Sequence, residues 1–158
     1  MNPFRRRVRP TGPVRVLFVV PDLRFGGAER HAATLAPALD PERVVASVVC
    51  IGEEGGLFAD LAATGVPARA LHLRRNPVAA LAALVRIMRA QRPDIVVTRG
   101  YNAEALGRIA AALTRVPRTV LWVHNCGDVE PRGRVRALVD RVLAPVTDAY
   151  YAVAHGQR

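Results

Sequence analysis

A glycine pair is the feature of this chain best suited to bind a charged ligand. Gly26 and Gly27 follow an apolar run and directly precede an expected helix. Bare N–H groups at a helix N-terminus bind anions and sugar hydroxyls, because they carry the positive end of the helix dipole. The alternative is a tight strand-to-helix turn that needs only the positive φ that glycine allows. The residues alone leave both interpretations open.

Polar residues also follow two later apolar runs. His124 ends one of them, with Asn125 beside it, and its imidazole suits either proton transfer near neutral pH or a structural role. Arg99 ends another run and is either solvated or in contact with an anion. Asn102, just beyond it, is a helix cap rather than a ligand.

Several other chemistries are disfavoured by the motifs. The loop with Gly26 and Gly27 is neither G-x-G-x-x-G nor G-x-x-x-x-G-K-[ST], which argues against a dinucleotide site and an NTPase. No metal triad or Ser-His-Asp order stands out, and we expect no bound metal. Cys50 and Cys126 belong to strands expected three places apart, about 14 Å. A disulfide needs Cα atoms within about 7 Å, so we predict buried free thiols.

The elements that must position these residues alternate along the chain. Apolar runs predict strands at 14–20, 44–51, 68–73, 95–98, 119–123 and 149–153, and helical periodicity predicts helices at 28–39, 57–63, 77–90, 103–113 and 134–143. In the last helix we expect Val135, Leu138, Val139, Val142 and Leu143 to face the core. Continuously apolar strands that alternate with helices predict an α/β fold with a parallel sheet covered on both faces. We expect the doubly wound, Rossmann-like order 3-2-1-4-5-6, with ligands beyond the carboxyl ends of the strands where the order reverses.

Composition limits the class of protein and its location. The 158 residues are 51% hydrophobic, which predicts one globular domain over 14–158 after a flexible basic tail at 1–13. The net charge of +10 comes from arginine without lysine, and it permits anionic partners, although no nucleic-acid-binding motif accompanies it. No apolar run approaches the roughly 20 residues that span a bilayer, and no cleavage site follows the arginines at 5–7. We expect a cytoplasmic protein, with peripheral membrane contact permitted by the basic tail.

Four segments, in this order, resemble the family-4 glycosyltransferases, which are retaining enzymes of the GT-B fold. They are the strand at 14–20 with its loop PDLRFGGAER, RPDIVV at 92–97, WVHN at 122–125 and TDAYYAV at 147–153. The resemblance covers residues 14–158 and implies the N-terminal, acceptor-side half of such an enzyme. It implies transfer of a sugar from a nucleotide-diphosphate sugar to an acceptor, with retention at the anomeric carbon.

The resemblance also implies roles for single residues. Gly26 and Gly27 are expected near the donor phosphates. His124, the catalytic candidate, is expected to contact the transferred sugar, with Asn125 as a neighbour. Arg99 joins the donor-binding candidates as an anion contact. No cofactor is implied beyond the nucleotide-sugar co-substrate. The basic tail permits, but does not require, a lipid-linked or phosphorylated acceptor.

Two departures from the family pattern limit what this chain is expected to do alone. The second domain of the family, which supplies a basic pair and two glutamates to the donor, has no counterpart before Arg158, and Ala154-His155 stands where the family often has Ser-Glu. Half a cleft does not exclude water, so we expect negligible activity from this polypeptide by itself. A fragment, a truncated gene product and a subunit of a split enzyme remain open. The alternative function is a non-catalytic module that binds a partner protein or a membrane.

Overall fold

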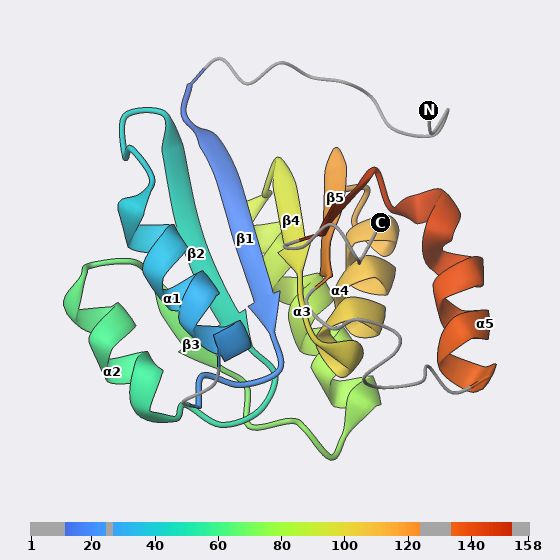
Figure 1. Ribbon diagram of the computed structural model, residues 1–158. Coiled ribbons are helices and arrows are strands. Elements are labelled where there is room, and N and C mark those ends of the chain that lie inside the picture. Colours follow the sequence, from blue (N-terminus) through green and yellow to red (C-terminus); the bar gives the residue numbers. More distant parts are fainter. Residues whose placement is uncertain (1–11, 25–26, 124–133, 153–158) are drawn as a thin grey trace.

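Six parallel strands form one sheet in the order β3-β2-β1-β4-β5-β6. The computed structural model describes residues 12–24, 27–123 and 134–152 (Figure 1). The strands are β1 (Val14–Val20), β2 (Val44–Cys50), β3 (Ala68–Ala70), β4 (Ile95–Thr98), β5 (Arg118–Val123) and β6 (Ala149–Ala152). The predicted fold class and strand order are confirmed.

The helices divide between the two faces of the sheet. They are α1 (Gly27–Ala38), α2 (Gly56–Ala63), α3 (Pro77–Gln91), α4 (Tyr101–Leu113) and α5 (Arg134–Leu143), followed by a short 3-10 turn, Ala144–Val146. In Figure 1, α1 and α2 lie over β1 to β3 on one face, and α3, α4 and α5 lie on the other. Right-handed crossovers impose this division, because the chain reverses its direction across the sheet between β3 and β4.

Strand β1 is buried on both faces, which accounts for its continuous apolar run from Leu17 to Val20. Leu17 and Val19 pack in the cluster formed with α3 and α4. Phe18 and Val20 pack in the cluster formed with α1 and α2. Alternate side chains of a strand point to opposite faces, so every residue in this stretch needs an apolar side chain.

Two elements differ from the sequence prediction. β3 ends at Ala70 rather than continuing to Leu73, because His72 adopts a positive φ of 56° that a regular strand does not accommodate. In α5, Leu138 and Val142 are 62% and 66% exposed, so the prediction that they face the core is wrong. None of the described helices is long and apolar enough to cross a bilayer.

Candidate functional site

The carboxyl ends of three strands meet at one rim of the sheet, where the strand order reverses. Val19 of β1 pairs with Thr98 of β4, and Thr98 pairs with Leu121 of β5. The segments that follow these strands therefore leave the sheet side by side. In an open parallel sheet this is the position at which ligands bind.

The sequence-predicted site residues fall unequally on the described part of the chain. Gly27 is the first residue of α1 and lies on the same rim as the end of β5 at Val123, as the parallel arrangement requires. Gly26, His124 and Asn125 lie outside the described residues, and their roles stay predictions.

Arg99 follows β4 at this rim and is buried, with 3% of its surface exposed. Its backbone N–H donates to the carbonyl of Val19 at 3.1 Å, which ties it to β1. Its guanidinium carbon lies 5.1 Å from the centroid of the Trp122 ring, a cation–π contact that is strengthened by the exclusion of water. Of the two roles left open for Arg99, the solvated one is wrong. A buried guanidinium at the switch point raises the local positive potential.

Trp122, near the end of β5, is the centre of an aromatic cluster that the sequence did not indicate. Its ring lies 5.6 Å from that of His31 in α1 and 5.6 Å from that of Tyr151 in β6, the latter edge-on. The side chain is 7% exposed, and within the described residues no acceptor lies within hydrogen-bonding distance of its buried Nε1. The signal that the sequence offers is an aromatic residue in each of the last two predicted strands. These two residues, Trp122 and Tyr151, are paired in the register of β5 and β6.

Two glycines hold the rim loops in close contact. Gly100 has a φ of 76°, and a Cβ built on it would lie 2.3 Å from Cγ of Pro21, which follows β1. Gly55, before α2, has a φ of 62°, and its Cβ would lie 2.4 Å from the carbonyl oxygen of Leu23. No larger residue fits at either position without moving the backbone. The loops after β1, β2 and β4 are therefore packed against one another.

Gly100 is also the N-cap of α4, so the predicted cap at Asn102 is wrong. Its N–H donates to Oε1 of Glu104 at 3.0 Å, and the N–H of Glu104 donates back to the carbonyl of Gly100 at 2.7 Å. The second bond is the first of the helix itself, and the first satisfies the N–H of the cap residue with the buried Glu104 carboxylate, near the positive end of the helix dipole. Asn102 lies within the first turn instead.

The rim beyond β2 and β3 is polar and more exposed. Nδ1 of His72 lies 2.9 Å from Oε2 of Glu53, and both side chains are about half exposed. A pair this exposed contributes little stability. Burial, reinforced by the charge of Asp22, raises the pKa of the nearby Cys50 thiol from 9.0 to about 12. Cys50 is a buried free thiol, as predicted, and is not a nucleophile at neutral pH. Cys126 lies outside the described residues.

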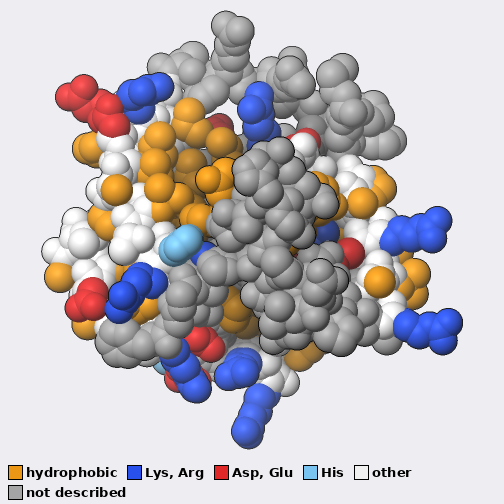
Figure 2. Space-filling model, viewed as in Figure 1, with side chains coloured by type: hydrophobic (Ala, Val, Ile, Leu, Met, Phe, Trp, Pro, Cys, Tyr) orange, Lys and Arg blue, Asp and Glu red, His pale blue; other side chains and the backbone are white. Residues whose placement is uncertain are grey.

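An apolar groove of about 690 Å³ runs beside α1 over β4, β5 and β6. Leu35 lines it from α1, with Val97, Val120 and Tyr151 from the strands. Right-handed crossovers place α3 to α5 on the opposite face, so among the described elements no helix covers this half of the sheet. Figure 2 shows hydrophobic side chains gathered on the α1 side of the molecule. A parallel sheet is normally covered on both faces, and this half-face is therefore suited to further contact.

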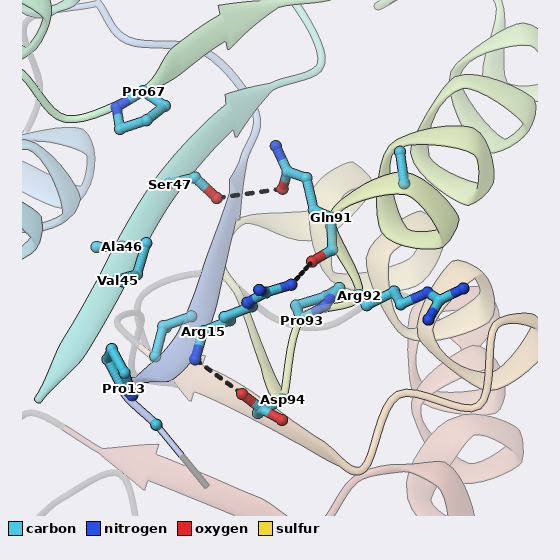
Figure 3. A pocket seen from close by; sticks show the side chains of 13 residues that line it. Pro13, Arg15, Val45, Ala46, Ser47, Pro67, Gln91, Arg92, Pro93 and Asp94 are labelled. Atoms are coloured by element: carbon cyan, nitrogen blue, oxygen red, sulfur yellow. Dashed lines mark hydrogen bonds between the residues drawn. The ribbon is translucent and has the colours of Figure 1, made fainter. Parts of the chain in front are cut away.

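A second hollow, of about 640 Å³, lies at the amino ends of the strands (Figure 3). Four of its polar residues take part in structural hydrogen bonds. Nη1 of Arg15 donates to the carbonyl of Gln91 at 3.1 Å, and Oγ of Ser47 donates to Oε1 of Gln91 at 3.2 Å. The backbone N–H of Arg15 donates to Oδ2 of Asp94 at 2.9 Å. These bonds fasten the end of α3 to β1 and β2, on the rim opposite the switch-point loops.

Comparison with known proteins is consistent with this geometry. A sequence profile described as Glycosyltransferase Family 4 matches residues 25–158, most of the chain. No protein of curated function matches the chain in sequence.

Solved structures share the fold at low sequence identity. The structure of HepE from Anabaena in complex with UDP superimposes with a TM-score of 0.67 at 20% identity, over 83% of this chain and 35% of that one. MurG from Acinetobacter baumannii gives 0.67 at 17% identity, over 92% and 43%. A putative UDP-N-acetylglucosamine 2-epimerase from Listeria monocytogenes gives 0.63 at 15% identity, over 93% and 41%. The chain spans less than half the length of each of these proteins.

Proposed function

Because this chain belongs to glycosyltransferase family 4, we propose that it is the acceptor-side N-terminal domain of a retaining glycosyltransferase. The enzyme moves a sugar from a nucleotide-diphosphate sugar to an acceptor. The observation that carries the proposal is the rim at the switch point, which holds the start of α1 at Gly27 and the buried Arg99 and Trp122. Such a rim supplies a helix N-terminus and a cation to the phosphates of a donor.

The residues divide the work by position. Gly26 and Gly27 approach the donor phosphates through bare N–H groups, and His124, with Asn125 beside it, contacts the sugar. Arg99 is buried at the same rim and adds positive potential without solvent screening. Preorganised donors of this kind stabilise the charge that develops on the leaving diphosphate. No metal or other cofactor takes part.

The remaining contacts to the donor come from a second domain, which faces the switch-point rim. The chain alone is inactive, since an open rim leaves the reacting atoms in water. The acceptor is lipid-linked, and the protein acts in the cytoplasm at the membrane surface. The net charge of +10 supports that location, because the cytoplasmic leaflet is anionic.

Reconstitution tests the proposal. The chain is mixed with a polypeptide that carries a family-4 second domain, and UDP-sugars are tried first, since HepE was solved with UDP. We expect labelled sugar to reach an acceptor only in the mixture, with the donor's anomeric configuration kept in the product by NMR. Because epimerases share the fold, a product epimerised at C2 without transfer would contradict the proposal.

The apolar groove beside α1 favours a second candidate, a non-catalytic module that binds a partner protein. Its lining is almost free of polar groups and includes Val97 and Val120. Tight binding of one partner protein by a chain that never supports sugar transfer would favour this function over the first.

A further inference from the structure

The outward face of α5 combines apolar and basic side chains. Leu138 and Val142 are 62% and 66% exposed, and Arg134 and Arg141 are exposed as well. Residues three, four and seven apart share one side of a helix, so all four project together. Figure 2 shows basic side chains on either side of hydrophobic ones at the edge of the molecule that α5 forms.

The acidic residue of α5 points away from this face. Oδ1 of Asp140 accepts a hydrogen bond from Nη2 of Arg108 in α4 at 2.5 Å. The side chain of Arg108 is 1% exposed and that of Asp140 is 18% exposed, so the ion pair lies between the two helices. It fastens α5 to α4 and neutralises the carboxylate. The described side chains of the outward face therefore carry positive charge alone.

We propose that this face docks the protein on an anionic phospholipid bilayer. Leu138 and Val142 enter the boundary between headgroups and acyl chains, and Arg134 and Arg141 reach the lipid phosphates with their apolar stems against the membrane. A protein partner fits this face less well. Stable protein interfaces bury about 800 Å² on each side around an apolar centre, and two apolar side chains are a small centre for a surface of that size.

The position of α5 places this membrane contact near the switch-point rim. Each helix runs opposite to the strands, so α5 begins on the rim at which β5 ends. A bilayer along α5 therefore lies next to the switch-point rim, within reach of a lipid-linked acceptor. The inference deepens the membrane location proposed above. Its test needs no donor and no second domain, so its failure and a failure of sugar transfer are distinguishable.

The experiment is flotation of the 158-residue chain with vesicles of phosphatidylcholine, with and without phosphatidylglycerol. Each arginine at an anionic surface changes the partition coefficient about fivefold, so R134Q/R141Q is expected to lower it about 25-fold. L138Q/V142Q is expected to abolish the binding that persists at high salt. Both pairs are exposed, and circular dichroism checks that the fold is kept.

The matched control is R43Q/R69Q, which removes the same charge at the opposite edge of the sheet, around β2 and β3. It is expected to change binding less than threefold, since those arginines lie beyond a Debye length from the bilayer. A fourth variant replaces the four tail arginines at 5–7 and 9 with glutamine. Equal losses from R134Q/R141Q and the control, or a loss in the tail variant alone, would overturn the proposal. The proposal would also be overturned if the unaltered chain does not bind anionic vesicles, or if it self-associates through α5.

Discussion

Replacing Gly100 with alanine measures how tightly the loops after β1 and β4 are packed. The new Cβ would lie 2.3 Å from Cγ and 2.9 Å from Cδ of Pro21, and the backbone would keep a φ of 76°. With a ψ of 140°, the backbone at Gly100 lies in a region that is nearly restricted to glycine, at a cost of about 1–3 kcal/mol for any other residue. Relieving the overlap costs about 1–3 kcal/mol more. We therefore expect Gly100→Ala to lower the free energy of unfolding by about 2–6 kcal/mol.

Two controls separate these contributions. Gly65 has a φ of 81° with nothing within 4 Å of a built Cβ, so Gly65→Ala carries only the backbone cost. Pro21→Ala removes the two ring atoms that the new Cβ would meet. In that background Gly100→Ala should cost only its backbone share of about 1–3 kcal/mol, and the double-mutant cycle should give a coupling of about 1–3 kcal/mol.

Urea unfolding, followed by circular dichroism and by the fluorescence of the single tryptophan, provides the free energies. Thermal melts should follow, at about 2–4 °C per kcal/mol for a domain of this size. If Gly100→Ala destabilises no more than Gly65→Ala, or if Pro21→Ala leaves its cost unchanged, the rim loops are not packed as described.

Three further predictions concern other parts of the molecule. Asp140→Asn should lower the free energy of unfolding in urea by about 3 kcal/mol, because it leaves the buried Arg108 charge uncompensated; an unchanged midpoint would contradict this. In a Cys126→Ser background, Cys50 should react with a thiol reagent only on unfolding. The contribution of the Cys50 thiol to stability should be constant below pH 9 and be lost between pH 9 and about 12, since the unfolded thiol ionises first; rapid labelling of the native protein would refute the assignment. In the reconstituted enzyme, His124→Ala should reduce transfer at least 100-fold at unchanged stability, and full activity would remove His124 from the site.

Strand positions and strand order follow from local chemistry. β1 and β4 begin and end where their apolar runs do, because strands buried on both faces consist mainly of apolar residues. β3 is an edge strand of the sheet, where burial is partial, and the positive φ of His72 ends it early. Sequence periodicity predicts best where packing is densest.

The rim depends on contacts between segments distant in sequence, which periodicity does not encode. Asn102 has a good capping side chain, yet the helix begins earlier and its N-cap is Gly100, where Pro21 leaves no space for a Cβ. In α5 the apolar residues lie on two sides of the helix. Val139 and Leu143 are partly buried, whereas Leu138 and Val142 are exposed. Periodicity reports an apolar face but not what covers it.

The most direct test of the central claim, that ligand chemistry lies at the carboxyl rim of the switch point, is NMR shift mapping. The ¹⁵N-labelled chain, together with a second-domain polypeptide, is titrated with UDP. The amides of Gly27 and Gly100 and the single indole N–H, that of Trp122, should shift in a saturable manner. Those of Arg15 and Ser47, at the amino-end hollow, should not move. Shifts confined to that hollow, with no change in the Gly27, Gly100 and Trp122 signals, would contradict the account.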